Sequence, residues 1–275
     1  MISYACSEGV ASLHLNAPAK GNALSADMVD ALLQAVHEAS NDASVHSLVL
    51  TGEGRHLCTG FDLSDLETQS EGDLLLRFVR IEQVLDALWR APVRTIAYAQ
   101  GRTWGAGADL FAACDVRWAC PQATFRFPGA GFGLVLGTRR LAQRVGLSAA
   151  RDWVSLGQEV NAESARSAGL ATRVHGLKAA EGAEGQGRED GPSGQGGLRQ
   201  TMIEQACTLP MVDRSTLAAL RAASNPNAAR DADADLAALV RSAARPGLKA
   251  RIADYRARTR AASAKPTSPP VKRTS

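Results

Sequence analysis

Hydrophobic positions along the chain follow two spacings, which predict strands separated by helices. Residues 10–15 alternate apolar and polar side chains, a spacing typical of a strand. Ser25 is a candidate N-cap, and the apolar residues that follow it recur at helical spacing. Short apolar runs at 47–51 and 95–99 predict two further strands. Strands that alternate with helices predict an α/β fold with a largely parallel sheet.

The second half of the predicted core continues this alternation. The pattern predicts helices at 75–89, 138–145, 148–156 and 161–169, the third opened by a Ser148 cap and the fourth by Asn161, and strands at 116–119, 124–127 and 170–174.

Composition changes along the chain predict four segments. Residues 1–175 form the predicted α/β core, and residues 176–197, rich in Gly, Glu and Gln, read as a flexible loop. Residues 198–262 are rich in Ala and Arg at helical spacing and predict a helical region. Residues 263–275 are predicted to be a disordered tail.

The stretch from 95 to 115 carries the strongest chemical signal. It predicts a buried strand, a glycine turn, and a helix whose first turn is Gly105 to Asp109. The first N–H groups of a helix lack intrahelical partners and sit at the positive end of its dipole, so they can hold an anion. Small residues there admit a ligand to the backbone. An anion site with the Asp109 carboxylate beside it suits chemistry through an oxyanion, although a helix-start acid can also serve the dipole alone.

Charge and cysteine content narrow the class of protein. A net charge of only +3 over 275 residues gives no argument for nucleic acid, and RNA binding rests only on the basic C-terminal tail. The five cysteines show no metal-ligand spacing and read as reduced thiols, which predicts a cytoplasmic protein without a metal. We expect no secretory signal at the N-terminus and no membrane span, because no apolar run is long enough.

Other catalytic motifs are incomplete or absent in this sequence. The run from Gly105 to Leu110 resembles a dinucleotide fingerprint but lacks its third small residue and its later acid. The chain contains no G-x-x-x-x-G-K-[ST] phosphate loop and no G-x-S-x-G nucleophile elbow. The missing elbow argues against a serine hydrolase.

Four motifs, in order along the chain, are similar to those of the crotonase superfamily, the enoyl-CoA hydratase/isomerase family. They are KGNALS (20–25), LCTGFDLSDL (57–66), GRTWGAGADLFAACD (101–115), and GTRRLAQRVG with the segment that ends in SAGLATRV (137–174). Each motif alone is weak, whereas four in order over roughly residues 1–175 are fairly specific.

The resemblance implies a crotonase-like spiral of ββα units, followed by C-terminal helices that build a homotrimer or a dimer of trimers. It implies an acyl-CoA thioester substrate, with coenzyme A as part of the substrate and no separate cofactor. The oxyanion hole would consist of the backbone N–H groups of Phe61 and Ala106, and Asp109 would be the catalytic acid/base. The resemblance also implies that these residues bind the substrate or CoA: Lys20, Arg55, Leu57, Cys58, Gly60, Asp62, Leu63, Trp104, Gly105 and Gly129.

The sequence departs from this family where the second catalytic glutamate of the hydratases would fall. That position lies near Gly129, and no Asp or Glu occurs between Asp115 and Asp152. Ser64 also replaces a lysine that often binds CoA phosphates, and Arg55 is a candidate substitute. The sequence therefore favours an enoyl-CoA hydratase or isomerase with a single acid. A one-base hydrolase or carbon–carbon lyase and a non-catalytic acyl-CoA-binding protein stay as alternatives.

Overall fold

The computed structural model describes residues 1–176, 195–210 and 212–264. Its strands are β1 (Ile2–Ser7), β2 (Val10–Leu15), β3 (Ser47–Gly52), β4 (Arg94–Ala99), β5 (Arg102–Trp104), β6 (Val116–Ala119), β7 (Thr124–Arg126), β8 (Val160–Asn161) and β9 (Arg173–Val174). The longer helices are α1 (Ala26–Asn41), α2 (Glu71–Arg90), α3 (Ala106–Ala113), α4 (Thr138–Val145), α5 (Leu147–Leu156), α7 (Gln195–Thr208), α8 (Arg214–Ser224), α9 (Ala228–Ala243) and α10 (Leu248–Ala264). Short helices are η1 (Pro18–Lys20), η2 (Gly129–Phe132) and α6 (Ala162–Ser167).

The strands form a large sheet and a small one. The large sheet has the order β1-β2-β3-β4-β6-β9, and all its pairs are parallel except the β1–β2 hairpin. The small sheet has the order β5-β7-β8. The main strands β4 and β6 therefore each continue, after a short turn, into a strand of the small sheet. This repeated step between two sheets gives the chain its spiral course.

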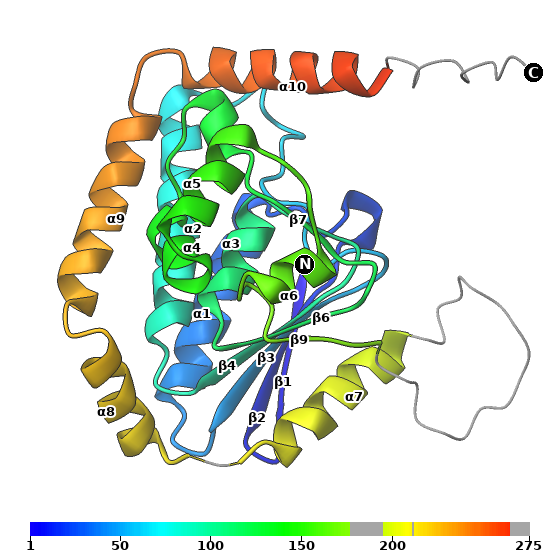
Figure 1. The fold of residues 1–275 in the computed structure, drawn as a ribbon, viewed down its shortest axis with the longest axis vertical. Helices are drawn as coiled ribbons and strands as arrows, with labels where there is room; N and C mark the ends of the chain where they lie inside the picture. Colours follow the sequence, from blue (N-terminus) through cyan, green and yellow to red (C-terminus); the bar gives the residue numbers. More distant parts are fainter. Residues whose placement is uncertain (177–194, 211, 265–275) are drawn as a thin grey trace, which may run out of the picture.

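Helices cover both faces of the large sheet (Figure 1). Leu48, Leu50 and Ala97 face the main core beneath α1 to α4, whereas Val49 and Ile96 belong to a second cluster beneath α7. Because helices pack on both faces of the sheet, every residue of β2 and β3 is buried, and neither strand has a solvent-exposed face. The polar residues of β2 are accommodated by hydrogen bonds, such as that between His14 Nδ1 and Thr51 Oγ1 at 2.8 Å.

Ion pairs connect the C-terminal helix α9 to helix α4 of the core. Arg139 on α4 pairs with Asp231 at 3.1 Å and with Asp235 at 2.7 Å, both on α9. Beside it, Arg140 pairs with Glu82 of α2 at 2.5 Å, and both side chains are almost completely buried. After α9 the chain turns, and α10 crosses the start of α2, where Lys249 Nζ donates to the Glu67 carbonyl at 2.5 Å (Figure 1). It also packs against η2. This crossing brings α10 beside the loop that contains Gly129.

Most predicted elements are present, with some corrections. The Ser25 cap of α1 is confirmed, because its Oγ accepts from the Met28 N–H at 3.2 Å. The Ser148 cap is wrong: α5 begins one residue earlier, and Gly146, with a φ of 82°, precedes it. Two strands are present that the hydrophobic pattern did not predict, the half-exposed hairpin strand β1 and the short strand β5.

Two of the predicted segments fall largely outside the described residues. The predicted loop 176–197 lies there except for its ends, and α7 already begins at Gln195 within it. The predicted tail 263–275 lies outside them from residue 265 onward.

Candidate active site

Two loops from different parts of the chain come into backbone contact at Gly60 and Gly105. Gly60 has a φ of +98°, and a Cβ there would lie 2.8 Å from the Trp104 carbonyl oxygen and 3.5 Å from the Ala106 nitrogen. Any side chain at residue 60 would therefore separate this loop from the start of α3. Gly105 has a φ of +54° and packs against Gly60 from the other side. The two glycines let the backbone of both loops approach one small space.

The hydrogen bonds of the first loop fix the direction of the Phe61 N–H group. The Leu24 N–H donates to the Gly60 carbonyl at 2.7 Å, and the Asp62 N–H donates to the Leu24 carbonyl at 3.0 Å. Because backbone groups of an extended chain alternate in direction, the N–H of Phe61 points away from Leu24. Ala106 is the first residue of α3, so its N–H has no acceptor within the helix. Both residues line one cavity.

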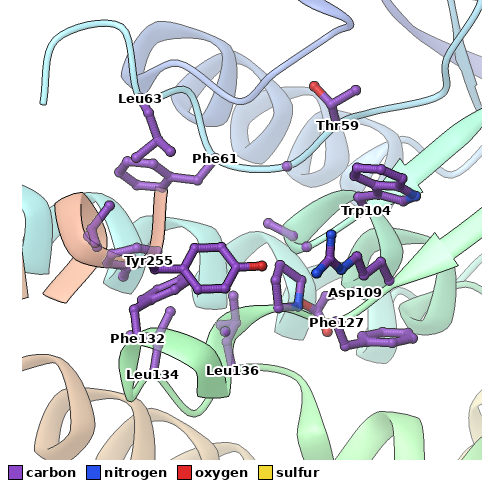
Figure 2. A pocket seen from close by; sticks show the side chains of 18 of the residues that line it. Thr59, Phe61, Leu63, Trp104, Asp109, Phe127, Phe132, Leu134, Leu136 and Tyr255 are labelled. Carbon is purple, nitrogen blue, oxygen red and sulfur yellow. The ribbon is translucent and has the colours of Figure 1, made fainter. Parts of the chain in front are cut away.

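This cavity has a volume of about 250 Å³ and is mainly apolar (Figure 2). Its walls come from the first loop, α2, the start of α3, the segment from Arg126 to Leu136, α5 and α10. Aromatic and aliphatic side chains make up most of the surface: Phe61, Leu63, Phe78, Trp104, Phe127, Phe132, Leu134, Leu136, Val154 and Ile252. Such walls fit an apolar group and exclude water from chemistry at their centre.

Asp109 is the acidic residue of this cavity and is only 5% exposed. It lies in the first turn of α3, and its Oδ1 is buried with no hydrogen-bond partner among the described residues. Burial raises its pKa well above the ordinary 3.8, the charge of Glu82 raises it further, and Arg140 opposes the shift. A carboxyl that is desolvated, unpartnered and open to a cavity is the usual environment of a general acid/base.

The structure places the predicted site residues in three groups. Gly60, Leu63, Trp104, Gly105 and Gly129 line the cavity together with Phe61, Ala106 and Asp109. Gly129 carries no acid, so this part of the wall has no carboxylate.

Lys20 and Asp62 lie next to the cavity rather than in its wall. They pair with each other at 3.1 Å, and 57% of the Lys20 side chain is exposed. The Asp62 carboxylate also accepts from the Ser64 N–H at 2.9 Å, so it caps the loop.

Leu57, Cys58 and Arg55 lie away from the cavity. The side chains of Leu57 and Cys58 are fully buried in the core, and the Cys58 carbonyl packs under Gly107, where a Cβ would come within 2.3 Å. Their backbone groups are engaged within the fold, since the Leu57 N–H donates to the Gln100 carbonyl at 2.9 Å and the Cys58 carbonyl accepts from the Trp104 N–H at 3.0 Å. Arg55 borders a separate surface pocket with His56, Gln100 and Arg102.

Sequence reasoning missed the part of the site formed by residues distant in the chain. Gly137 packs directly on Asp109, and Tyr255 and Ile252 reach the cavity from α10. Gly137 was visible as the end of a glycine-rich loop, but nothing in the sequence linked it to Asp109. Nothing in the sequence of α10 indicated that it contributes to the site, because Tyr255 resembles any other apolar position of a helix.

Two further observations bear on cofactors and membranes. In the portion of the chain that the structure describes, no three His, Cys, Asp or Glu residues gather closely enough to hold a metal ion. Among the same residues, no helix is long and apolar enough to cross a membrane.

The spiral core, the C-terminal helices and the cavity at the start of α3 define a crotonase-like protein, and comparison with known proteins agrees. A family model described as enoyl-CoA hydratase/isomerase matches residues 5–181. The chain therefore belongs to the enoyl-CoA hydratase/isomerase family, within the crotonase superfamily. The crotonase-like fold predicted from the motifs is confirmed.

Relatives and solved structures support this assignment. The chain is 34% identical over 187 residues to the probable enoyl-CoA hydratase echA6 of Mycobacterium leprae, covering 66% of this chain and 74% of that protein. A solved structure from Bordetella parapertussis, whose name assigns it to the enoyl-CoA hydratases/isomerases, is 40% identical, covers 96% of this chain and 99% of its own, and has a TM-score of 0.76. An enoyl-CoA hydratase structure from Bacillus halodurans is 20% identical with a TM-score of 0.71, covers 92% of this chain and 99% of its own, and supports the fold.

Proposed function

We propose that this protein is an enzyme that processes acyl-CoA thioesters through an enolate. Membership of the enoyl-CoA hydratase/isomerase family supports this substrate class. One observation carries the proposal. Asp109, whose buried Oδ1 has no hydrogen-bond partner among the described residues, lines the same apolar cavity as Phe61 and Ala106.

Each group then has a chemical role. Asp109 removes a proton from the carbon next to the thioester carbonyl, and the electron pair left behind moves onto the carbonyl oxygen. The N–H groups of Phe61 and Ala106 stabilise that oxyanion, each typically contributing about 2.7–4 kcal/mol. Fixed backbone donors suit this role because they need no reorganisation as the charge develops. The raised pKa of Asp109 suits a group that must both take and return a proton near neutral pH.

Double-bond migration in an enoyl-CoA is the reaction that we favour over hydration. Hydration in this family uses two carboxylates across the substrate, and Gly129 leaves the second position without one. One base beside an oxyanion hole is enough to move a proton between carbons. The same arrangement supports a one-base hydrolase or carbon–carbon lyase, which stays the alternative reaction class.

The walls of the cavity favour an apolar acyl group. Aromatic and aliphatic side chains surround Asp109, and a volume of about 250 Å³ leaves room for a group of limited size. For the CoA end of the substrate we propose Lys20, whose ammonium group is more than half exposed beside the first loop. Arg55 is the second candidate, from its position on the neighbouring surface pocket. We also propose that the protein assembles as a homotrimer or a dimer of trimers.

A non-catalytic acyl-CoA-binding protein is the second candidate function. The missing acid at Gly129 favours it, since loss of one catalytic carboxylate is a route to a binding protein.

Proton exchange separates the two functions. Acyl-CoA thioesters, including 2-enoyl and 3-enoyl forms, are incubated with the protein in heavy water and analysed by mass spectrometry. Deuterium next to the thioester supports an enolate, and a shifted double bond, added water or released CoA identifies the reaction. Binding of a thioester without exchange would favour the non-catalytic function.

A further inference from the structure

Tyr255, on α10, lines the cavity together with the two loops that carry the backbone N–H groups. Its ring packs edge-on against Phe132, with the ring centres 5.5 Å apart. It also lies on Gly131, where a Cβ would come within 2.7 Å of the ring, so glycine at 131 makes room for it. Figure 2 shows the hydroxyl directed into the cavity, toward the side where Asp109 and Phe127 lie. The ring therefore fills space beside η2, the short helix that begins at Gly129, where the family's second acid is missing.

Several other polar side chains of this cavity already donate to backbone carbonyls. The Thr59 hydroxyl donates to the Lys20 carbonyl at 3.4 Å. The Thr259 hydroxyl is bound to the Tyr255 carbonyl in the same way. Arg126 Nε donates to the Gly157 carbonyl at 2.6 Å.

The Tyr255 hydroxyl differs from these groups, because no hydrogen bond within the described residues engages it. The cavity also contains Arg256, but a guanidinium group stays protonated and cannot cycle a proton at neutral pH. A phenol both donates and accepts, so it can give up a proton and regain one. Tyr255 is therefore the side chain of this wall that can complement Asp109 in proton transfer.

We propose that Tyr255 is a second catalytic residue, which delivers a proton to the substrate carbon remote from the thioester. This inference rests on the proposed function and completes its chemistry. Asp109 takes a proton from the carbon next to the thioester of a 3-enoyl-CoA, and the electron pair spreads over the dienolate. The O–H bond of Tyr255 breaks as a C–H bond forms at the far carbon, and the electron pair settles as a double bond next to the thioester. The Tyr255 phenolate then takes up one proton from water, and Asp109 releases one to water, so no proton is gained or lost overall.

Replacing Tyr255 with Phe removes the hydroxyl and keeps the ring that packs on Gly131 and Phe132. The experiment follows a 3-enoyl-CoA in heavy water and measures separately the deuterium that enters next to the thioester and the amount of shifted product. The Tyr255→Phe protein should bind the thioester as tightly as the wild type and retain exchange. It should form shifted product at least about 100-fold more slowly, the lower end for a lost general acid.

The Tyr4→Phe variant is the matched control, because Tyr4 lies on β1 of the large sheet and does not line the cavity. It should leave exchange and product formation unchanged. Product formation by Tyr255→Phe at the wild-type rate would overturn the proposal. Equal losses of exchange and product would also overturn it, because they would mean that the ring only positions the substrate. Failure of the proposed function looks different, since the wild type itself would then show no exchange.

Discussion

Gly137 leaves the space that the carboxylate of Asp109 occupies. A Cβ at residue 137 would lie 2.1 Å from Oδ1 of Asp109 and 2.7 Å from its Cγ. Gly137 also has a φ of +65°, in the left-handed region that favours glycine, and it directly precedes α4. The position of the acid on α3 therefore depends on a missing side chain at the start of α4.

The Gly137→Ala substitution should displace the carboxylate of Asp109 and remove most of the turnover. The new methyl group cannot coexist with Oδ1 at 2.1 Å, so either the acid or the start of α4 must move. A misplacement of about 1 Å typically costs about 100-fold in rate. We expect a loss of that size in kcat/KM, with acyl-CoA binding retained.

The Gly146→Ala substitution is the matched control. Gly146 has a φ of +82° at the other end of α4, and nothing lies within 4 Å of the position of its Cβ. Both substitutions carry the strain of a positive φ, about 1–3 kcal/mol, but only the one at 137 meets Asp109. Similar activities of the two variants would contradict the role that we assign to Gly137.

The Asp109→Asn substitution should abolish turnover and stabilise the fold at neutral pH. Burial chiefly, and then Glu82, raises the pKa of Asp109 well above 3.8, whereas an unfolded Asp ionises at about 3.9. Between these two pKa values the folded state holds a proton that the unfolded state has lost, so stability falls as pH rises through this window. Asn does not titrate and escapes this loss.

Denaturant unfolding at several pH values tests this expectation. The free energy of unfolding of Asp109→Asn should exceed that of the wild type at pH 7, and the difference should shrink as pH falls toward about 4. Asp152→Asn, at an exposed position of α5, should alter neither stability nor turnover. A variant that is inactive but no more stable at pH 7 would mean that burial does not disfavour the ionised acid.

The buried pair behind Asp109 should set the pH range of activity. Asp109 must be ionised to act as a base, so kcat/KM should rise with pH through its raised pKa. Glu82 contributes to that raised pKa, whereas Arg140 opposes it. The Glu82→Gln substitution removes the negative charge and leaves the Arg140 charge, so the acid limb of the pH profile should move to lower pH.

The Glu82→Gln substitution should also lower the free energy of unfolding, and a nearby acid of α2 provides a control for the pH profile. Breaking a buried ion pair typically costs about 3–5 kcal/mol, although Asp235 lies 3.6 Å from Arg140 and can keep part of the interaction. Asp86→Asn removes a charge one turn further along α2, from a residue paired with Arg90. It should leave the acid limb in place. An unchanged limb in Glu82→Gln would show that desolvation alone sets the pKa of Asp109.

The parts of this site that the sequence predicted each depend on residues that lie close together along the chain. A run of small residues after a strand predicted the start of α3 and placed Asp109 in its first turn. The first loop, around Gly60, was found by its resemblance to a family motif.

The missing parts depend on contacts between distant segments. Gly137 meets Asp109 only because α4 packs on α3, and the ring of Tyr255 reaches Gly131 from more than a hundred residues away. Neither the spacing of residues nor the composition of the chain encodes such a contact between distant segments. Burial of β2 on both faces was hidden for the same reason, since it depends on α7, which lies far along the chain.

The Gly129→Glu substitution tests whether the missing second acid sets the reaction. Gly129 lines the cavity, and a Cβ there would lie 3.3 Å from the Leu134 carbonyl oxygen, a tight contact that a small shift of the loop can relieve. A carboxylate at this position can orient a water molecule toward the substrate, while Asp109 supplies the proton. We therefore expect Gly129→Glu to gain hydration of a 2-enoyl-CoA, measured as loss of the conjugated double bond with addition of one water. Gly129→Gln has the same size without the charge and should show no gain. Hydration by both variants would point to the shape of the loop, whereas hydration by the wild type at the rate of Gly129→Glu would mean that the reaction needs no second carboxylate.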